Sequence, residues 1–188
     1  GVRILRQNPE EMIFSFIISQ NNMIPRIKAI IERTAQTLGE KKSFMGEEYF
    51  SFPKAEVLAK QSVDFYYKSG YGYRADYMPS AAKSVLTDEF NISEQGLTTA
   101  ELRKRLMKIK GIGPKVADCV ALFGYHRADS FPVDTWIEKL YREDFKGTFK
   151  DRKKITDFFL NEFGEYSGYI QQYIFYYKRT LENRAGKK

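Results

Sequence analysis

The chain has 188 residues and a formal net charge of +7, from 31 Lys and Arg against 24 Asp and Glu. This length suits one substantial domain or two small lobes, and the positive balance favours a polyanionic partner such as nucleic acid. A single cysteine, Cys119, and a single histidine, His126, exclude an internal disulfide, an iron–sulfur cluster or cysteine-ligated zinc built by this sequence alone, and most histidine-based sites.

The first half of the sequence predicts helices separated by turns that contain glycine or proline. Asn8 and Pro9 suit the N-cap and first position of a helix with an apolar face that includes Phe16. A second helix is predicted over 25–38 and ends at Gly39. Two further elements follow, namely a short helix opened by residues 52–54 and a glycine-broken loop at 70–74 that leads into a helix near 74–86.

The second half continues the helical pattern. Thr98 and Glu101 fit a capping box, and the helix that they begin is joined by the tight turn 110–115 to another helix. Later helices are predicted over 134–142, 151–163 and 168–183. Because no alternating strand pattern is visible, we predict an all-α fold.

The helices on either side of Gly111-Ile112-Gly113 form a candidate helix-hairpin-helix motif at about 98–123. Glycine lets a backbone approach another group closely, and the N–H groups at the start of the second helix suit an anion such as a DNA phosphate. The same turn also serves as an ordinary connection between helices. From these residues alone, both interpretations stay open.

Lys115 follows this turn directly, and a desolvated lysine amine is a nucleophile that forms Schiff bases. Asp134 ends the apolar run Phe131-Pro132-Val133 and is suited to cap the next helix, which would hold its carboxylate in place. The two residues are 134 − 115 = 19 positions apart, enough for a helix and a return loop, so they are able to face one cleft. The alternatives are a surface lysine on a phosphate and an aspartate that only caps a helix.

No apolar run reaches membrane-spanning length, and the sequence does not begin with a signal-peptide pattern. We therefore expect an intracellular protein, in the cytoplasm or nucleoid of a bacterium or in the nucleus or mitochondrion of a eukaryote. Because the sequence begins Gly1-Val2-Arg3 without an initiator methionine, we expect it to be a fragment or a processed chain.

At these motifs the sequence resembles the helix-hairpin-helix, Gly/Pro-Asp superfamily of DNA glycosylases, and within it the 8-oxoguanine DNA glycosylases. The run 106–119 followed by 131–134 carries the likeness, and the stretches 1–7, 14–22, 72–77 and 167–175 extend it over essentially the whole of 1–188. The resemblance implies two helical lobes that flank a cleft. The family's N-terminal β-rich domain, which helps to sense the oxidised base, is absent from this sequence.

The resemblance implies a bifunctional glycosylase and abasic-site lyase that excises 8-oxoguanine opposite cytosine in base excision repair. Lys115 matches the nucleophile that attacks C1′ of the damaged nucleoside and forms a Schiff base, after which β-elimination cuts the strand. Asp134 matches the carboxylate that stabilises positive charge on the sugar. Duplex DNA with oxidised guanine is the implied partner of a monomeric enzyme without a membrane.

Excision requires the base to be flipped out of the stack, so the resemblance also implies a base pocket. Phe175 matches the ring that stacks on the base, Gln171 the amide that reads its Watson–Crick edge, and Cys119 the opposite wall. Asn21 matches the residue that fills the gap and contacts the estranged cytosine. Arg26 and Arg74 match the arginines that bind that cytosine, and Tyr73 matches a wedge beside it.

The hairpin has two implied binding roles. Gly111, Gly113 and Lys115 match the phosphate site. The backbone carbonyls of Met107, Ile109 and Ile112 match a site for a monovalent or divalent cation, and no other cofactor is implied.

Two positions depart from the family pattern: Trp136 stands where eukaryotic relatives carry a histidine, and Lys178 where relatives often carry an aspartate. Three rival interpretations stay open. An endonuclease-III-like enzyme usually needs a four-cysteine cluster, and a compact archaeal 8-oxoguanine glycosylase fits Asn21 and Gln171 less well. A non-catalytic helix-hairpin-helix module would need neither Lys115 nor Asp134.

Overall fold

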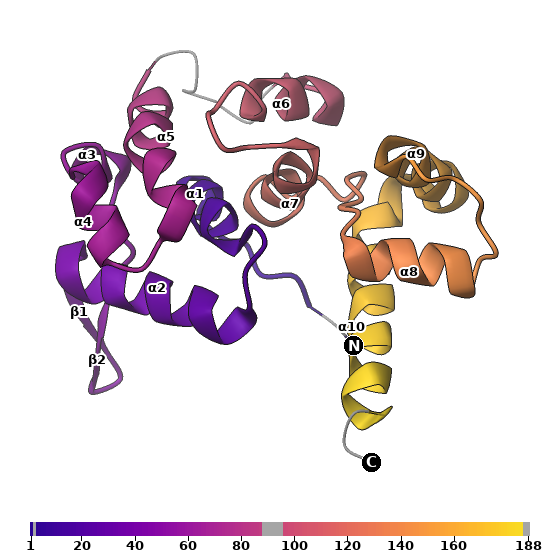
Figure 1. Cartoon of the computed structure of the whole chain (residues 1–188), viewed down its shortest axis with the longest axis horizontal. Helices are drawn as coiled ribbons and strands as arrows, with labels where there is room; N and C mark the ends of the chain where they lie inside the picture. Colours follow the sequence, from indigo (N-terminus) through magenta and orange to yellow (C-terminus); the bar gives the residue numbers. More distant parts are fainter. Residues whose placement is uncertain (2, 88–95, 186–188) are drawn as a thin grey trace.

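The computed structural model describes residue 1, residues 3–87 and residues 96–185, and this part of the chain is mostly helical (Figure 1). The first group of elements contains α1 (Pro9–Ser19), α2 (Ile24–Leu38), α3 (Ala55–Leu58), α4 (Val63–Lys68), the 3-10 helix η1 (Gly72–Asp76), α5 (Met78–Val85), α6 (Thr99–Leu106) and α7 (Pro114–Gly124). The second contains α8 (Thr135–Glu143), α9 (Arg152–Phe163), the 3-10 helix η3 (Gly164–Tyr166) and α10 (Ser167–Ala185). Each group has its own apolar core, so the predicted all-α fold with two helical lobes is confirmed.

The caps predicted from the sequence fix where several helices begin. The side chain of Asn8 accepts the N–H of Glu11 at 3.1 Å, and Pro9 is the first residue of α1. Thr98 and Glu101 form a reciprocal capping box at the start of α6. These side chains satisfy N–H groups that have no partner within the first helical turn. The helix starts are therefore local properties of the sequence.

One short segment is extended, although the sequence predicted no strand. β1 (Lys41–Phe44) pairs antiparallel with β2 (Glu47–Phe50). The connecting residues Met45 and Gly46 have φ values of 50° and 84°, which is the geometry of a tight hairpin turn. Every residue of both strands is exposed, so the segment lacks the apolar alternation by which a half-buried strand is recognised.

Gly39 ends α2 as predicted, but for a different reason from the one expected. Its φ is −83°, so it does not need the left-handed conformation usual for a terminating glycine. A methyl group on this residue would instead collide with the backbone carbonyl of Ser51. The glycine therefore permits the close approach of the chain that follows the hairpin.

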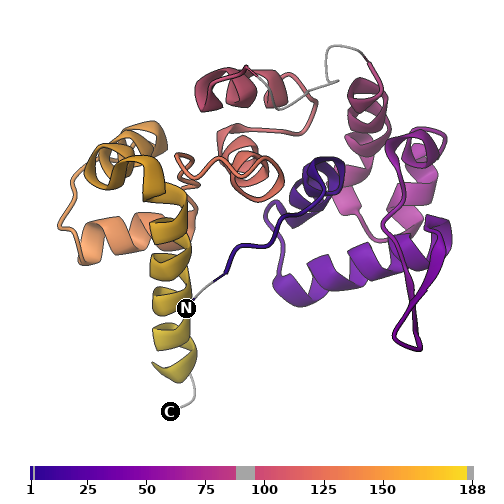
Figure 2. The same ribbon diagram turned by 180° about the vertical axis from the view of Figure 1, so that it is seen from behind.

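Helix α7 is on the side of the first group that faces the second group, in both views of the molecule (Figures 1 and 2). It packs along α1, whose Phe14, Ile17 and Ile18 are completely buried. Residues 3–8 run from the start of α1 toward α10 (Figure 2). The described part of the chain contains no helix with the length and apolarity needed to cross a bilayer.

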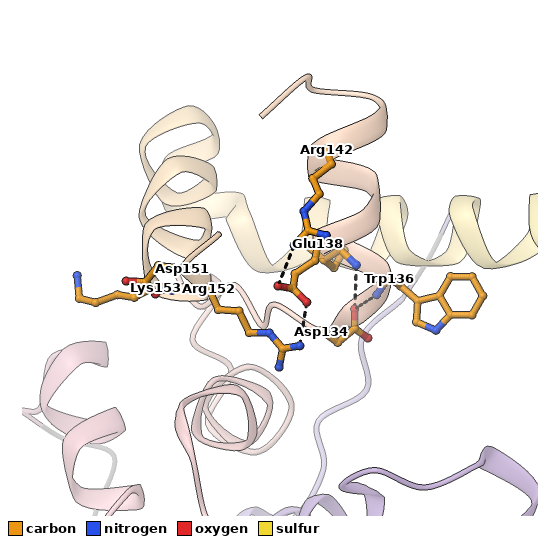
Figure 3. Close-up of polar contacts among 8 residues, drawn as sticks. Asp134, Trp136, Glu138, Arg142, Asp151, Arg152 and Lys153 are labelled. Atoms are coloured by element: carbon orange, nitrogen blue, oxygen red, sulfur yellow. Dashed lines mark hydrogen bonds and ion pairs between the residues drawn. The ribbon is translucent and has the colours of Figure 1, made fainter. Parts of the chain in front are cut away.

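The second core is built around aromatic rings and one ion pair. Phe131 and Phe159 stack with their ring centroids 4.5 Å apart. Glu138 of α8 pairs with Arg152 at the start of α9 at 2.8 Å (Figure 3). Together these contacts hold α8 and α9 against the segment that precedes α8.

A buried ion pair connects α6, α7 and the chain that leads into the second group. Arg103 Nε of α6 lies 2.7 Å from Asp118 Oδ1 of α7. The hydroxyl of Ser130 donates to the backbone carbonyl of Asp118 at 3.0 Å and approaches its carboxylate at 3.4 Å. Burial raises the pKa of Asp118 to about 6, and Arg103 and Ser130 offset only part of that rise.

We expect Asp118 to make stability depend on pH. Between about pH 4 and pH 6, the raised pKa lets Asp118 keep its proton in the folded chain, whereas the unfolded chain has lost it. The free energy of unfolding therefore falls as the pH rises through this window. Relative to Asp118→Asn, the wild-type free energy of unfolding should fall by about 3 kcal/mol between pH 4 and pH 7. Urea denaturation over this range measures the difference. The control is Asp64→Asn, at an exposed position of α4. The assignment would be contradicted if the difference in unfolding free energy between wild type and Asp118→Asn stayed flat or rose with pH.

Gly168 allows the start of α10 to close on the loop between α7 and α8. Its N–H donates to the carbonyl of Ala128 at 2.6 Å, and an added methyl would lie 2.5 Å from Leu122 Cδ1 and 2.8 Å from the Ser130 carbonyl oxygen. We expect Gly168→Ala to lower the free energy of unfolding by about 1–3 kcal/mol, because of this overpacking. Gly113→Ala is the control, since no atom would lie within 4 Å of its methyl group. Equal denaturation midpoints for Gly168→Ala and wild type would show that the loop adapts freely.

Candidate active site at the hairpin

The hairpin turn between α6 and α7 is fixed from two sides. Gly111 has a φ of 93°, and an added methyl would lie 3.0 Å from the Tyr77 side chain, so the turn requires glycine here. Gln20, at the end of α1, donates from Nε2 to the Gly111 carbonyl at 2.8 Å. The N–H of Ile112 donates to the Ile109 carbonyl at 3.0 Å. The first lobe therefore holds the turn in one conformation.

The start of α7 is open. Gly113 is the N-cap residue and supplies no side-chain hydrogen bond, and Pro114 is the first helical residue. No heavy atom lies within 4 Å of the position that a Gly113 methyl would take. The first N–H groups of α7 thus lack a side-chain cap, an arrangement suited to an anion.

Lys115 lies in the first turn of α7 and is half-buried. Its Nζ is 5.7 Å from the ring centroid of Phe16 in α1. The side chain also hydrogen-bonds the thiol of Cys119, one helical turn further along α7. The amine is therefore held between an aromatic ring and a thiol rather than extended into solvent.

Cys119 connects the two predicted catalytic residues. Burial raises the pKa of its thiol to about 11, Lys115 lowers it in part, and the nearby charges of Asp118 and Asp134 raise it further. The thiol consequently stays neutral near pH 7 and is a poor nucleophile. Lys115 and Asp134 are therefore both near enough to the buried thiol for their charges to change its pKa.

Asp134 is held rigidly at the start of α8. Its Oδ1 accepts the N–H of Trp136 at 3.0 Å and the N–H of Ile137 at 2.9 Å. Both bonds end on the same oxygen (Figure 3), so the second oxygen is available to another group. The carboxylate is half-buried and cannot rotate without losing its cap.

The segment that leads to Asp134 is anchored by side chains from the second group. The hydroxyl of Thr156 in α9 donates to the Phe131 carbonyl at 3.5 Å, and Gln171 Nε2 in α10 donates to the Pro132 carbonyl at 3.1 Å. Gln171 is only 3% exposed. These contacts place the amide of Gln171 beside the chain that carries Asp134.

The other predicted pocket residue, Phe175, packs half-buried against the second core. The two described surface hollows are lined by residues 28–32 and by residues 149–162, so neither contains Gln171 or Phe175. The two side chains share one face of α10, and the base pocket predicted around them is not among these hollows.

The residues predicted near the estranged cytosine gather at the end of α1. Asn21 is exposed with a φ of 43°, and Arg74 donates to the backbone carbonyls of Gln20, Asn21 and Tyr71. Arg74 is 2% exposed, and burial lowers its pKa. Its guanidinium therefore holds the loop that presents Asn21 outward.

Two neighbours complete this cluster. Arg26 donates to the Gly70 carbonyl at 3.0 Å. Tyr73 is exposed, and its ring meets that of Tyr77 edge-on at 6.0 Å. The cluster thus presents an amide, an arginine and an aromatic ring on one surface.

The two departures from the family pattern have clear structural settings. Trp136 is half-buried in the first turn of α8, and its backbone N–H contributes to the Asp134 cap. Lys178 Nζ lies 2.7 Å from Glu143 and 3.4 Å from Asp144, which raises its pKa. Lys178 therefore ties α10 to the end of α8.

Three residues around the site carry roles that the sequence did not reveal. The sequence pattern gave Phe16 only a place in the core, whereas its ring lies near Lys115 in the structure. Gln172 hydrogen-bonds Gln171. Asp118 offered one signal, a charged residue inside an otherwise apolar helical run. No described group of three or more His, Cys, Asp or Glu side chains suits a metal ion.

Similarity to known proteins covers nearly the whole chain. The chain is 32% identical over 200 residues to a probable N-glycosylase/DNA lyase of Methanothermobacter thermautotrophicus. This match covers 95% of the chain and 64% of the relative. The solved structure of MBOgg1 in complex with a low-affinity DNA ligand is 42% identical, with a TM-score of 0.91, over 97% of this chain and 63% of that one. No family model matches the sequence.

A third match is the crystal structure of Clostridium acetobutylicum 8-oxoguanine glycosylase/lyase with double-stranded DNA containing cytosine opposite 8-oxoguanine. It is 38% identical, with a TM-score of 0.90, over 97% of this chain and 63% of that one. The chain thus spans less than two thirds of the length of these proteins. Over nearly its whole length, the chain is therefore similar to proteins named N-glycosylase/DNA lyase and 8-oxoguanine glycosylase/lyase.

Proposed function

We propose that the chain is the catalytic helical region of a bifunctional DNA glycosylase and abasic-site lyase, which excises 8-oxoguanine opposite cytosine from duplex DNA. The observation that carries this proposal is that Lys115, in the first turn of α7, and Asp134, fixed at the N-cap of α8, both lie near enough to the buried Cys119 to change the pKa of its thiol. A module that only bound DNA would need neither the held amine nor the fixed carboxylate. The DNA in the Clostridium acetobutylicum structure, with cytosine opposite 8-oxoguanine, supports the choice of substrate.

The geometry suits attack at a sugar carbon. As the bond between the base and C1′ breaks, positive charge develops on the sugar, and the fixed Asp134 carboxylate stabilises it. Lys115 Nζ forms a bond to C1′ and loses a proton, and the departing base gains one. The sugar ring then opens, as the C1′–O4′ bond breaks and O4′ gains a proton, which leaves a Schiff base between C1′ and Nζ. The Schiff base makes the C2′ proton acidic, and removal of that proton expels the 3′ phosphate by β-elimination. Water then releases the lysine.

The open start of α7 is the proposed phosphate site, formed by Gly111, Gly113 and Lys115. We propose that a cation assists there through the carbonyls of Met107, Ile109 and Ile112. The Ile109 carbonyl already accepts the N–H of Ile112 and keeps a second lone pair for such an ion. No other cofactor belongs to the proposal, and the DNA substrate places the reaction inside the cell.

The base pocket is proposed on α10, where Phe175 stacks on the flipped base and Gln171 reads its edge, with Cys119 opposite. Because Gln171 is 3% exposed, entry of a base must displace part of its cover. On the other strand, Asn21 is the proposed contact to the unpaired cytosine. The side chains proposed to support it are Arg26, Tyr73 and Arg74.

Lys115→Gln should abolish covalent capture of DNA. Borohydride treatment during reaction with a duplex containing 8-oxoguanine opposite cytosine should trap a wild-type adduct, and the variant should form at least about 100-fold less, because it lacks the nucleophile. The matched control is Lys104→Gln, which changes an exposed lysine of α6 and should be trapped like wild type. A wild-type chain that binds the duplex without any adduct would support the non-catalytic module instead.

Asp134→Asn should slow excision by about 10²–10³-fold while weakening duplex binding less than about threefold. Asparagine caps helices nearly as well as aspartate, so α8 should stay folded and only the negative charge is lost. Asp151→Asn makes the same change at the N-cap of α9 and should leave excision unchanged. Single-turnover rates and binding titrations give the two quantities, and equal losses in both would contradict the assigned role.

A further inference from the structure

Two neighbouring glutamines of α10 form an amide pair beside the proposed base pocket. Gln171 is 3% exposed, and its Nε2 donates to the Pro132 carbonyl at 3.1 Å. Gln172 is half-buried, and its Nε2 donates to Gln171 Oε1 at 2.5 Å. The amide of Gln171 is therefore bonded at both ends.

These two bonds give the Gln171 amide a single orientation. The Pro132 carbonyl can only accept a hydrogen bond, so Gln171 must turn its NH₂ group toward it. Oε1 then lies on the other side of the amide, where the NH₂ group of Gln172 meets it. If the Gln171 amide flipped alone, its oxygen would meet the Pro132 carbonyl oxygen and its NH₂ group would meet that of Gln172, so two hydrogen bonds would be replaced with two repulsive contacts. If both amides flipped, the repulsion at Pro132 would remain.

A fixed carbonyl oxygen discriminates between purine edges. The Watson–Crick edge of guanine and 8-oxoguanine presents N1–H and an exocyclic NH₂ as donors next to O6. Adenine and 8-oxoadenine present N1 as an acceptor at the corresponding position. The second lone pair of Gln171 Oε1 suits the first edge and repels N1 of the second.

We propose that Gln172 is a positioning residue that fixes the polarity of Gln171 and thereby sets the preference for a guanine-type edge. This inference rests on the proposed function, because it assumes that the flipped base meets Gln171. Pro132 lies two residues before Asp134, so the same pair aligns the edge-reading amide with the segment that carries the catalytic carboxylate.

The test compares two lesions that share the oxidised C8 and differ in their Watson–Crick edge. Single-turnover excision rates are measured on one duplex sequence, with 8-oxoguanine or 8-oxoadenine placed opposite cytosine. Gln172→Leu removes the donor, and we expect the ratio of the two rates to fall about fivefold. Gln172→Glu keeps the shape but sets a carboxylate against Oε1, so the ratio should fall by about tenfold or more.

The lyase rate on an abasic site distinguishes a positioning role of Gln172 from a merely structural one, because a loss of folding would lower this rate as well. No base occupies the pocket in that substrate, so both variants should cut it within about twofold of the wild-type rate. Gln36→Leu is the matched control, since Gln36 is an exposed glutamine of α2 that bonds only Glu32 among the described residues. Its rate ratio should equal that of wild type.

The outcomes separate the two proposals. If wild type excises 8-oxoguanine and both Gln172 variants keep its rate ratio, the positioning role is overturned and the proposed function stands. If the variants lose lyase activity on abasic DNA as much as excision, Gln172 supports folding rather than specificity, and the inference is again overturned. A wild-type chain that excises neither base contradicts the proposed function itself.

Discussion

The short segment Ser130–Asp134 is the constraint on which the rest of the site depends. It crosses from the first apolar core to the second. The Ser130 hydroxyl donates to the Asp118 carbonyl of α7, and side chains from α9 and α10 donate to the carbonyls of the next two residues. Asp134 ends the segment by capping α8 with two hydrogen bonds to one oxygen. If this segment shifted, the carboxylate, the cap and the anchor of Gln171 would all move together.

The hairpin supplies the matching constraint on the nucleophile. Gly111 permits a turn that Tyr77 and Gln20 hold in place, and α7 starts directly after it. Lys115 therefore emerges at an uncapped helix start, one turn before the thiol that Asp134 also approaches. In the proposed function, the phosphate site and the amine that attacks the sugar therefore come from a few consecutive residues of one small motif.

Much of this arrangement could be predicted because it is encoded locally. The caps at Asn8, Thr98 and Asp134 depend on residues two or three positions away, and the sequence alone placed them. The exposed hairpin at 41–50 was missed because it has no buried face to impose an alternating pattern. Ser130, a partner of Asp118, and Pro132, a partner of Gln171, lie 12 and 39 positions from them, so only the folded chain shows these contacts.

The central claim is that one particular amine captures the sugar. Peptide mapping by mass spectrometry, applied to the borohydride-trapped complex with 8-oxoguanine duplex DNA, tests it most directly. The account predicts that the deoxyribose remnant is attached to Lys115 alone. A remnant on any other amine of the chain would contradict it.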